Sequence, residues 1–217
     1  MKYVQLTKSN VSQDVLNAFD CGHPDFNNFL AEDAVQYTNN GNGVTYILVD
    51  DTAKEIEEIF AFCTLKASAL YYSKEDNNDR LFSTSCVEIK YFAIDKAFQK
   101  TKTGKRGVEK YFSTYFFEIL LSDLYEFSTT IIGFTGVFLR ANENGERLYR
   151  RKKFVDATQY MIPYEEDDEL GKCTPMYLSI NENIYSIFGV EWNIFSIIIK
   201  SQKSIYSGWY SQNANDV

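Results

Sequence analysis

Two residues of this chain have side chains suited to moving protons: a glutamate within an apolar segment and a tyrosine in a short helical segment. Glu88 lies in an otherwise apolar run that is typical of a strand. Burial disfavours an ionised carboxylate and raises its pKa toward the range of a useful base. Tyr149 offers a hydroxyl that can donate a proton. Both also have structural explanations, with Glu88 on the solvent side of its strand beside Lys90 and Tyr149 as a packed core side chain.

The segment that holds Tyr149 has the pattern of a strand, a short helix and a second strand. An apolar run at 131–139 predicts the first strand. Asn142 has the side chain of a helix N-cap, and the predicted helix covers about 143–151. The chain then returns to an apolar residue at Phe154. Tyr149 would thus lie late in a helix that directly follows a buried strand.

The other predicted elements favour a mixed sheet. Hydrophobic periodicity predicts strands at 3–6, 44–49, 56–70, 86–94, 130–139 and 175–180, and helices up to Phe19, from Pro24, over 108–127 and over 143–151. Strands and helices alternate only in the second half, which argues against a doubly wound parallel sheet throughout. We therefore expect an α+β fold, a three-layer α/β sandwich in which helices cover both faces of a mixed, mostly antiparallel sheet.

The length of 217 residues suits one domain with an appendage. We expect the domain at 1–180 and a C-terminal extension at 181–217, where the composition shifts toward Ile, Tyr, Ser and Asn. Apolar residues in the extension could form a stripe, which needs a surface to cover. That surface would belong to this domain or to a second copy, so a homodimer through the extension is one expectation.

Charge and composition disfavour several classes of function. The net charge of −8 argues against a nucleic-acid partner, because phosphate binding needs a basic face. One local basic cluster remains: Lys100, Lys102, Lys105, Arg106 and Lys110. The four cysteines form no C-x-x-C pair and only one His is present, so we expect reduced thiols and no metal. Without a secretory leader or an apolar span, a soluble cytoplasmic protein is the expectation.

The segment at 142–154 resembles the N-x-x-A-x-x-L-Y-x-x-x-G-F element of the GNAT N-acetyltransferase family. It follows the pattern at Asn142, Leu148, Tyr149 and Phe154, and it departs where Gly145 replaces the usual Ala and Lys153 the usual Gly. A second block, at 19–34 and 45–50, is similar to the N-terminal signature of a bacterial GNAT subgroup. That subgroup includes acetyltransferase toxins that modify aminoacyl-tRNA.

The resemblance implies transfer of an acetyl group from acetyl-CoA to an amine, by direct attack in a ternary complex. Tyr149 would protonate the departing thiolate, and Glu88 would be the base, in a segment similar to the family pattern E-I-x-F-x-A-I. Asn142 would bind the cofactor arm or cap the helix. The backbone of Phe92, Ala93 and Ile94 would hold pantetheine, in the manner of an added strand.

The loop expected to hold the cofactor phosphates departs from the family. The usual Q/R-x-x-G-x-G/A is replaced by a stretched run in which we assign cofactor contacts to Gln99, Gly104, Lys105, Arg106 and Gly107. Phe29 and Tyr46, from the N-terminal block, would border the acceptor cleft.

Three functions fit these observations. The first is an acetyltransferase for a small-molecule or protein amine. The second is a toxin-like enzyme acting on aminoacyl-tRNA, which the net acidity disfavours and a basic surface beside the cleft would favour. The third is a non-catalytic binding protein, which the degenerate phosphate loop and the aromatic extension suggest. Binding of acetyl-CoA separates the third from the two enzymes.

Overall fold

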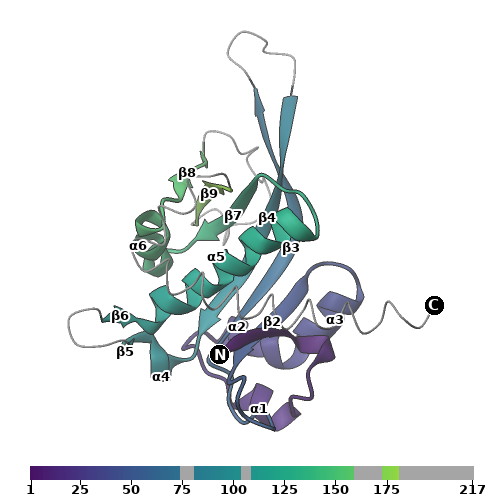
Figure 1. Cartoon of the computed structure of the whole chain (residues 1–217), viewed down its shortest axis with the longest axis vertical. Coiled ribbons are helices and arrows are strands. Elements are labelled where there is room, and N and C mark those ends of the chain that lie inside the picture. Colours follow the sequence, from purple (N-terminus) through teal and green to yellow (C-terminus); the bar gives the residue numbers. More distant parts are fainter. Residues whose placement is uncertain (74–80, 104–108, 159–172, 181–217) are drawn as a thin grey trace, which may run out of the picture. The chain divides into compact units, whose positions relative to one another are not determined.

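The fold is a seven-stranded sheet with helices packed on both faces (Figure 1). A computed structural model describes residues 1–73, 81–103, 109–158 and 173–180. These residues belong to the unit Met1–Ile180. The predicted extension at 181–217 lies outside the described residues.

The sheet has the strand order β1-β2-β3-β4-β7-β9-β8. Its strands are β1 (Lys2–Gln5), β2 (Val44–Val49), β3 (Ala61–Ser73), β4 (Leu81–Ile94), β7 (Gly136–Ala141), β8 (Val155–Asp156) and β9 (Thr174–Ser179). Neighbours pair antiparallel except β4 and β7, which are parallel. The chain crosses between these two through a helix, as a parallel connection requires. A separate two-stranded ribbon joins β5 (Lys102–Thr103) to β6 (Lys110–Tyr111).

The N-terminal helices cover one face of the sheet. They are a 3-10 turn (Leu6–Lys8), α1 (Gln13–Ala18), α2 (Pro24–Asn28), a π-helical turn (Phe29–Asp33) and α3 (Ala34–Asn39). Ser12 caps α1 by accepting a hydrogen bond from the Val15 N–H, and Pro24 occupies the first turn of α2. Their core includes Phe29, Ile47 and Phe62.

The second face carries α4 (Lys96–Gln99), α5 (Phe112–Thr130) and α6 (Glu143–Arg151). Figure 1 shows α5 crossing the sheet. Its buried residues recur three and four positions apart, as a helix that packs one side on a sheet requires: Phe116, Phe117, Leu120, Leu121 and Leu124. Leu48 packs in the α5 core, whereas the adjacent Ile47 packs under the N-terminal helices. This alternation shows that β2 is covered on both sides.

A β-bulge interrupts the pairing of β3 with β4. Thr64 lies opposite Tyr91, and the next residue, Leu65, lies opposite Ile89, so Lys90 is an extra residue on β4. Bulges bend the strand that carries them and increase its local twist. This bend occurs in the middle of the sheet, where β4 leaves its other neighbour.

The predicted fold class is confirmed, and the predicted helix at 143–151 has the bounds expected. Several other bounds differ. β3 begins at Ala61 rather than 56, and the predicted strand at 130–139 begins only at Gly136. α5 begins at Phe112 rather than 108, because Lys110 and Tyr111 are paired with β5. No described helix is long and apolar enough to cross a membrane.

Candidate functional site

The parallel strands β4 and β7 part along their length. Their pairing runs from Cys86 opposite Gly136 to Ile89 opposite Leu139, and ends there. β4 continues to Ile94, paired with β3 alone among the described strands. Residues 90–94 thus present one strand edge to a gap. An extended ligand can add to such an edge through main-chain hydrogen bonds.

The predicted pantetheine contacts Phe92, Ala93 and Ile94 lie on this parted segment. Ala93 and Ile94 are 6% and 7% exposed, and the ring of Phe92 packs against that of Phe117 with centroids 5.1 Å apart. Their side chains therefore belong to the core, and only their backbone can serve a ligand. The Ile94 carbonyl is already engaged, because it accepts a hydrogen bond of 2.9 Å from the Gln99 side chain. That bond occupies one lone pair of the carbonyl, and the contact of Ile94 with pantetheine remains a prediction.

Tyr149 packs on Phe117, the side chain that Phe92 of β4 also contacts. Its ring lies 5.1 Å from Phe117 and 5.9 Å from Phe154, between centroids. Burial raises the pKa of Tyr149 well above its ordinary value, so the phenol remains protonated at neutral pH. The Tyr149 hydroxyl has no hydrogen-bond partner among the described residues. The geometry therefore presents a protonated phenol one ring away from the parted strand.

The end of α6 fixes this tyrosine through its backbone. The Phe154 N–H donates to the Tyr149 carbonyl and the Lys153 N–H to the Arg150 carbonyl, both at 3.1 Å. These two bonds, with the contact between Phe154 and Tyr149, form a Schellman motif. Lys153 takes the left-handed conformation that the motif needs, with φ of 67°. The family pattern has Gly at this position, and a side chain there is strained by about 1 kcal/mol.

Gly145, the other departure from the family pattern, lies under the Tyr149 ring. A Cβ added at Gly145 would come within 2.8 Å of the tyrosine Cε2 and 3.2 Å of the Asn142 Oδ1. Glycine therefore makes room for the ring in its observed position. The same Asn142 Oδ1 accepts a hydrogen bond of 2.8 Å from the Gly145 N–H, so Asn142 caps α6. Capping was one of the two predicted roles of Asn142, and its contact with a cofactor remains a prediction.

A buried charge cluster, which the sequence did not indicate, ties α6 to α5. Glu118, 4% exposed, accepts a hydrogen bond from Lys152 through Oε1 and one of 2.8 Å from Lys110 through Oε2. Lys152 is the C-cap residue of α6 and is 7% exposed. Lys110 is in β6, just before α5 begins. The partners of Glu118 are 34 and 8 residues away, so no local pattern could have marked this cluster.

Glu88 and Tyr149 approach the sheet from opposite sides. Leu65, the register partner of Ile89, lines a hollow beneath α5, so Ile89 faces α5 and the preceding Glu88 faces away. Glu88 is partly exposed and makes no ion pair or hydrogen bond with the described residues. Its predicted pairing with Lys90 is thus not observed. Glu88 lies just before the point where β4 and β7 part.

The structure does not bring Phe29 and Tyr46 together. Phe29 packs on Tyr91, 4.2 Å between ring centroids, on the face of the N-terminal helices that Glu88 also shares. Tyr46 lies on the α5 face, in the hollow that contains Leu65. The two residues thus face opposite sides of the sheet, and their assignment to the acceptor site remains a prediction.

A polar cluster fastens the turn before α2 to the end of β4. Asp20 accepts hydrogen bonds from Lys96, from the Gly22 N–H and from Asn27, and these bonds lower its pKa to about 2. Asp95 in turn accepts a hydrogen bond from the Asp20 N–H. The N-terminal helices are therefore held against the strand that borders the gap.

Gln99, a predicted cofactor residue, belongs to the same connection. Its Nε2 donates to the Cys21 carbonyl at 2.7 Å and to the Ile94 carbonyl. The other predicted phosphate-loop residues, Gly104, Lys105, Arg106 and Gly107, lie outside the described residues. Among the described residues, no group of His, Cys, Asp or Glu is arranged to hold a metal ion.

No family model matches the chain, and no curated protein matches it in sequence. Solved structures do match. A Tyr-to-Phe mutant of the AtaT toxin, bound to the C-terminus of the antitoxin AtaR and acetyl-CoA, is 19% identical with a TM-score of 0.60. The match covers 87% of this chain and 98% of that one.

Two further solved structures match to a similar extent. AtaT complexed with acetyl-methionyl-tRNAfMet is 20% identical with a TM-score of 0.58, and a Tyr-to-Phe mutant of KacT is 19% identical with a TM-score of 0.55. Each covers 86% of this chain and 98% of the other. The architecture of this chain, a mixed sheet with helices on both faces, is therefore the GNAT-like α+β fold that these structures share.

Proposed function

We propose that this protein transfers the acetyl group of acetyl-CoA to an amine, by direct attack of the amine in a ternary complex. One observation carries the proposal: Phe117 contacts both Phe92, on the parted edge of β4, and Tyr149, each with ring centroids 5.1 Å apart. A protonated phenol and an open strand edge thus share one aromatic support. The fold and its toxin relatives support the same chemistry.

Acetyl-CoA supplies the acyl group as a thioester. The backbone of residues 90–94 would hold the pantetheine arm as an added strand. The Tyr149 hydroxyl would donate its proton to the leaving sulfur, and its raised pKa keeps that proton available at neutral pH. Glu88, on the other face, would accept the proton that the amine loses. The amine nitrogen would form a bond to the thioester carbonyl carbon, and collapse of the tetrahedral intermediate would break the carbon–sulfur bond and release CoA as the thiol.

The phosphates of the cofactor would lie near the N-terminus of α5, where the helix dipole favours anions, although the first N–H of the helix, that of Phe112, already donates to the Thr101 carbonyl at 3.0 Å. Gln99, Gly104, Lys105, Arg106 and Gly107 are the proposed contacts. Gln99 Nε2 already donates to two carbonyls, so Lys105 and Arg106 would supply most of the charge.

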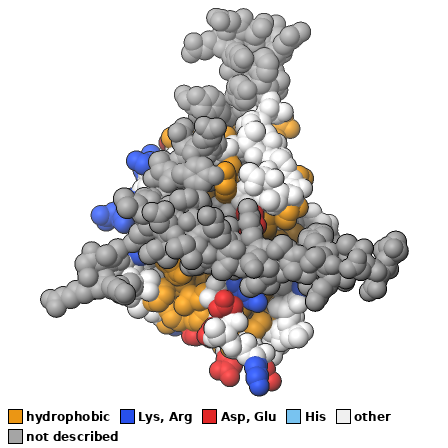
Figure 2. Space-filling view, in the orientation of Figure 1, with side chains coloured by type: hydrophobic (Ala, Val, Ile, Leu, Met, Phe, Trp, Pro, Cys, Tyr) orange, Lys and Arg blue, Asp and Glu red, His pale blue; other side chains and the backbone are white. Residues whose placement is uncertain are grey.

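For the acceptor, we propose an aminoacyl-tRNA. α6 and its C-terminal turn carry three exposed cations with no partner among the described residues: Arg147, Arg151 and Lys153. Figure 2 shows Lys and Arg side chains at the left edge of the molecule, where α6 lies in Figure 1. This local basic surface adjoins Tyr149, so a polyanion could bind beside the reaction site although the net charge is −8. The solved structures with a similar fold include AtaT complexed with acetyl-methionyl-tRNAfMet.

The first experiment is calorimetric titration of acetyl-CoA into the full chain, with release of free CoA followed in the presence of candidate amines. Saturable binding and amine-dependent release are expected. Tyr149→Phe should keep acetyl-CoA affinity within about threefold and lower kcat by roughly 100-fold, because it removes a general acid and keeps the ring. Absence of binding would favour the non-catalytic alternative, and an unchanged kcat in Tyr149→Phe would reject the acid role.

The second experiment compares an aminoacyl-tRNA with the free aminoacyl ester at several salt concentrations. Replacing Arg147 and Arg151 by Gln should weaken tRNA binding and reduce the salt slope by about one for each phosphate that is no longer neutralised. The matched control is Arg150→Gln, since Arg150 is on the same helix but already pairs with Glu146 at 2.6 Å. If the free ester is acetylated as fast as the tRNA, the acceptor proposal fails while the acetyltransferase proposal stands.

A further inference from the structure

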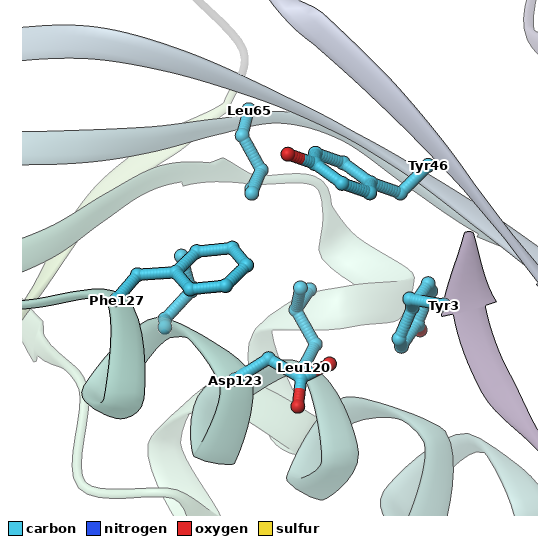
Figure 3. A pocket seen from close by; sticks show the side chains of 7 residues that line it. Tyr3, Tyr46, Leu65, Leu120, Asp123 and Phe127 are labelled. Carbon is cyan, nitrogen blue, oxygen red and sulfur yellow. The ribbon is translucent and has the colours of Figure 1, made fainter. Parts of the chain in front are cut away.

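A small hollow lies between α5 and the strands β1, β2 and β3 (Figure 3). Its cavity volume is about 40 Å³, room for about three water molecules. It is lined by Tyr3, Tyr46, Leu65, Leu120, Asp123, Leu124 and Phe127. Of these residues, the proposed reaction uses none. The hollow is therefore distinct from the parted strands, and it faces α5 rather than the N-terminal helices.

Asp123 is the one charged residue of this lining. Figure 3 shows Asp123 on α5, with Phe127 to one side, Tyr3 to the other, and Tyr46 and Leu65 on the sheet across the hollow. Asp123 has no hydrogen bond or ion pair with any described residue. Burial, and secondarily the negative charge of Glu126, raise its pKa to about 7. An ionised carboxylate without a partner in apolar surroundings is costly, so an external cation that enters the hollow is favoured.

The lining selects the kind of cation. A divalent metal ion needs several oxygen ligands, and only one carboxylate is present in the lining. Three aromatic side chains line the hollow together with that carboxylate, and aromatic rings attract ammonium groups through cation–π interactions. The volume accommodates an ammonium group that carries one or a few methyl groups.

We propose that this hollow binds the ammonium head of an organic amine, held by the Asp123 carboxylate and by the rings of Tyr3, Tyr46 and Phe127. The same head could belong to a free small amine or to a lysine side chain of another protein. The sequence-based assignment of Tyr46 to a substrate site gives no support to this proposal, since that assignment placed Tyr46 beside Phe29.

The test is calorimetric titration of the full chain with methylammonium and butylammonium chloride at pH 8, in phosphate buffer, against NaCl of equal ionic strength. We expect saturable binding of the amines alone, weakened at least tenfold in Asp123→Asn. Glu126→Gln is the matched control: it removes an equal charge three residues away, outside the lining, and should stay within threefold of the parent chain. Affinity should also fall at least tenfold at pH 5, where Asp123 is protonated.

Two further measurements keep the test decisive. Tyr46→Leu removes one ring without touching the carboxylate and should weaken binding severalfold, even if Asp123→Asn proves poorly folded. Titration with N-acetyl-lysine methylamide shows whether the ammonium group belongs to a lysine side chain or to a small amine. Binding of this peptide-like amine points to a protein partner, whereas binding of the free amines alone points to a small molecule. If no amine binds beyond NaCl, or if Asp123→Asn binds as tightly as the parent chain, the proposal is wrong.

Discussion

Replacing Asp123 by Asn should change how stability depends on pH. In the folded chain the pKa of Asp123 is raised from 3.8 to about 7. Between these values the folded state binds a proton that the unfolded state has lost, so the free energy of unfolding decreases as pH rises from 4 to 7. Above pH 7 Asp123 is ionised in both the folded and the unfolded state, and burial of its charge lowers the free energy of unfolding by the full amount. At about 1.4 kcal/mol per pKa unit the shift corresponds to roughly 4 kcal/mol, and partial exposure of the side chain reduces this to roughly 2–4 kcal/mol.

The Asn side chain carries no charge, so this penalty is absent at every pH. The titratable groups that face Asp123 are Glu126 on its own helix, Tyr3 on β1, Tyr46 on β2 and Cys63 on β3. Burial raises the pKa of both tyrosines and of Cys63, so these three remain neutral throughout the window.

Urea unfolding of the two proteins at pH 4.5, 6 and 8, in buffers free of amines, measures the effect. The stability of Asp123→Asn relative to the parent chain should increase steadily with pH and level off near pH 8. Any constant cost of placing an amide in the hollow cancels in this comparison. A difference between the two proteins that is the same at all three pH values would refute the burial argument.

Three other substitutions test the parts around Tyr149. Lys153→Gly relieves the left-handed strain and should raise the free energy of unfolding by about 1 kcal/mol, read from the urea midpoint. Gly145→Ala gains helix propensity, but its methyl group displaces the Tyr149 ring, so kcat should fall while the melting temperature changes little. A lower melting temperature together with the lower kcat would contradict a specific effect on the ring. Glu118→Gln leaves Lys152 buried without its charge partner and should destabilise the fold by roughly 3 kcal/mol, and a stability within about 0.5 kcal/mol of the parent chain would show that the cluster contributes little.

Local signals predicted the elements that local interactions define. The Asn142 cap gave the correct start of α6, and alternation in β2 and periodicity in α5 gave their types. The start of α5 was predicted too early, because Lys110 and Tyr111 form the strand β6 instead of the first turn of the helix. The partner strand of β6, β5, begins eight residues earlier in the chain. A two-residue ribbon of this kind has no periodicity to detect.

Features that depend on tertiary pairing could not be predicted. The sequence suggested that Phe29 and Tyr46 border one cleft, but the alternation of β2 places Tyr46 beneath α5, and only the packing of the helices determines which face that is. The charge partners of Glu118 and the isolation of Asp123 also depend on contacts between distant segments. The resemblance assigned the pantetheine contacts to Phe92, Ala93 and Ile94, and these residues lie beyond the point where the pairing of β4 with β7 ends.

The bulge at Lys90 has a consequence for how this chain can change over evolution. Ile89 lies opposite Leu65 and Tyr91 opposite Thr64, so deletion of Lys90 would make these two residues neighbours in a regular ladder. Tyr91 would still face the N-terminal helices and Phe92 would still face α5, as their partners on β3 require. The deletion would instead remove the local bend of β4 beside the gap. Substitutions of Lys90 keep that bend, whereas loss of the residue would straighten the strand edge that borders the gap.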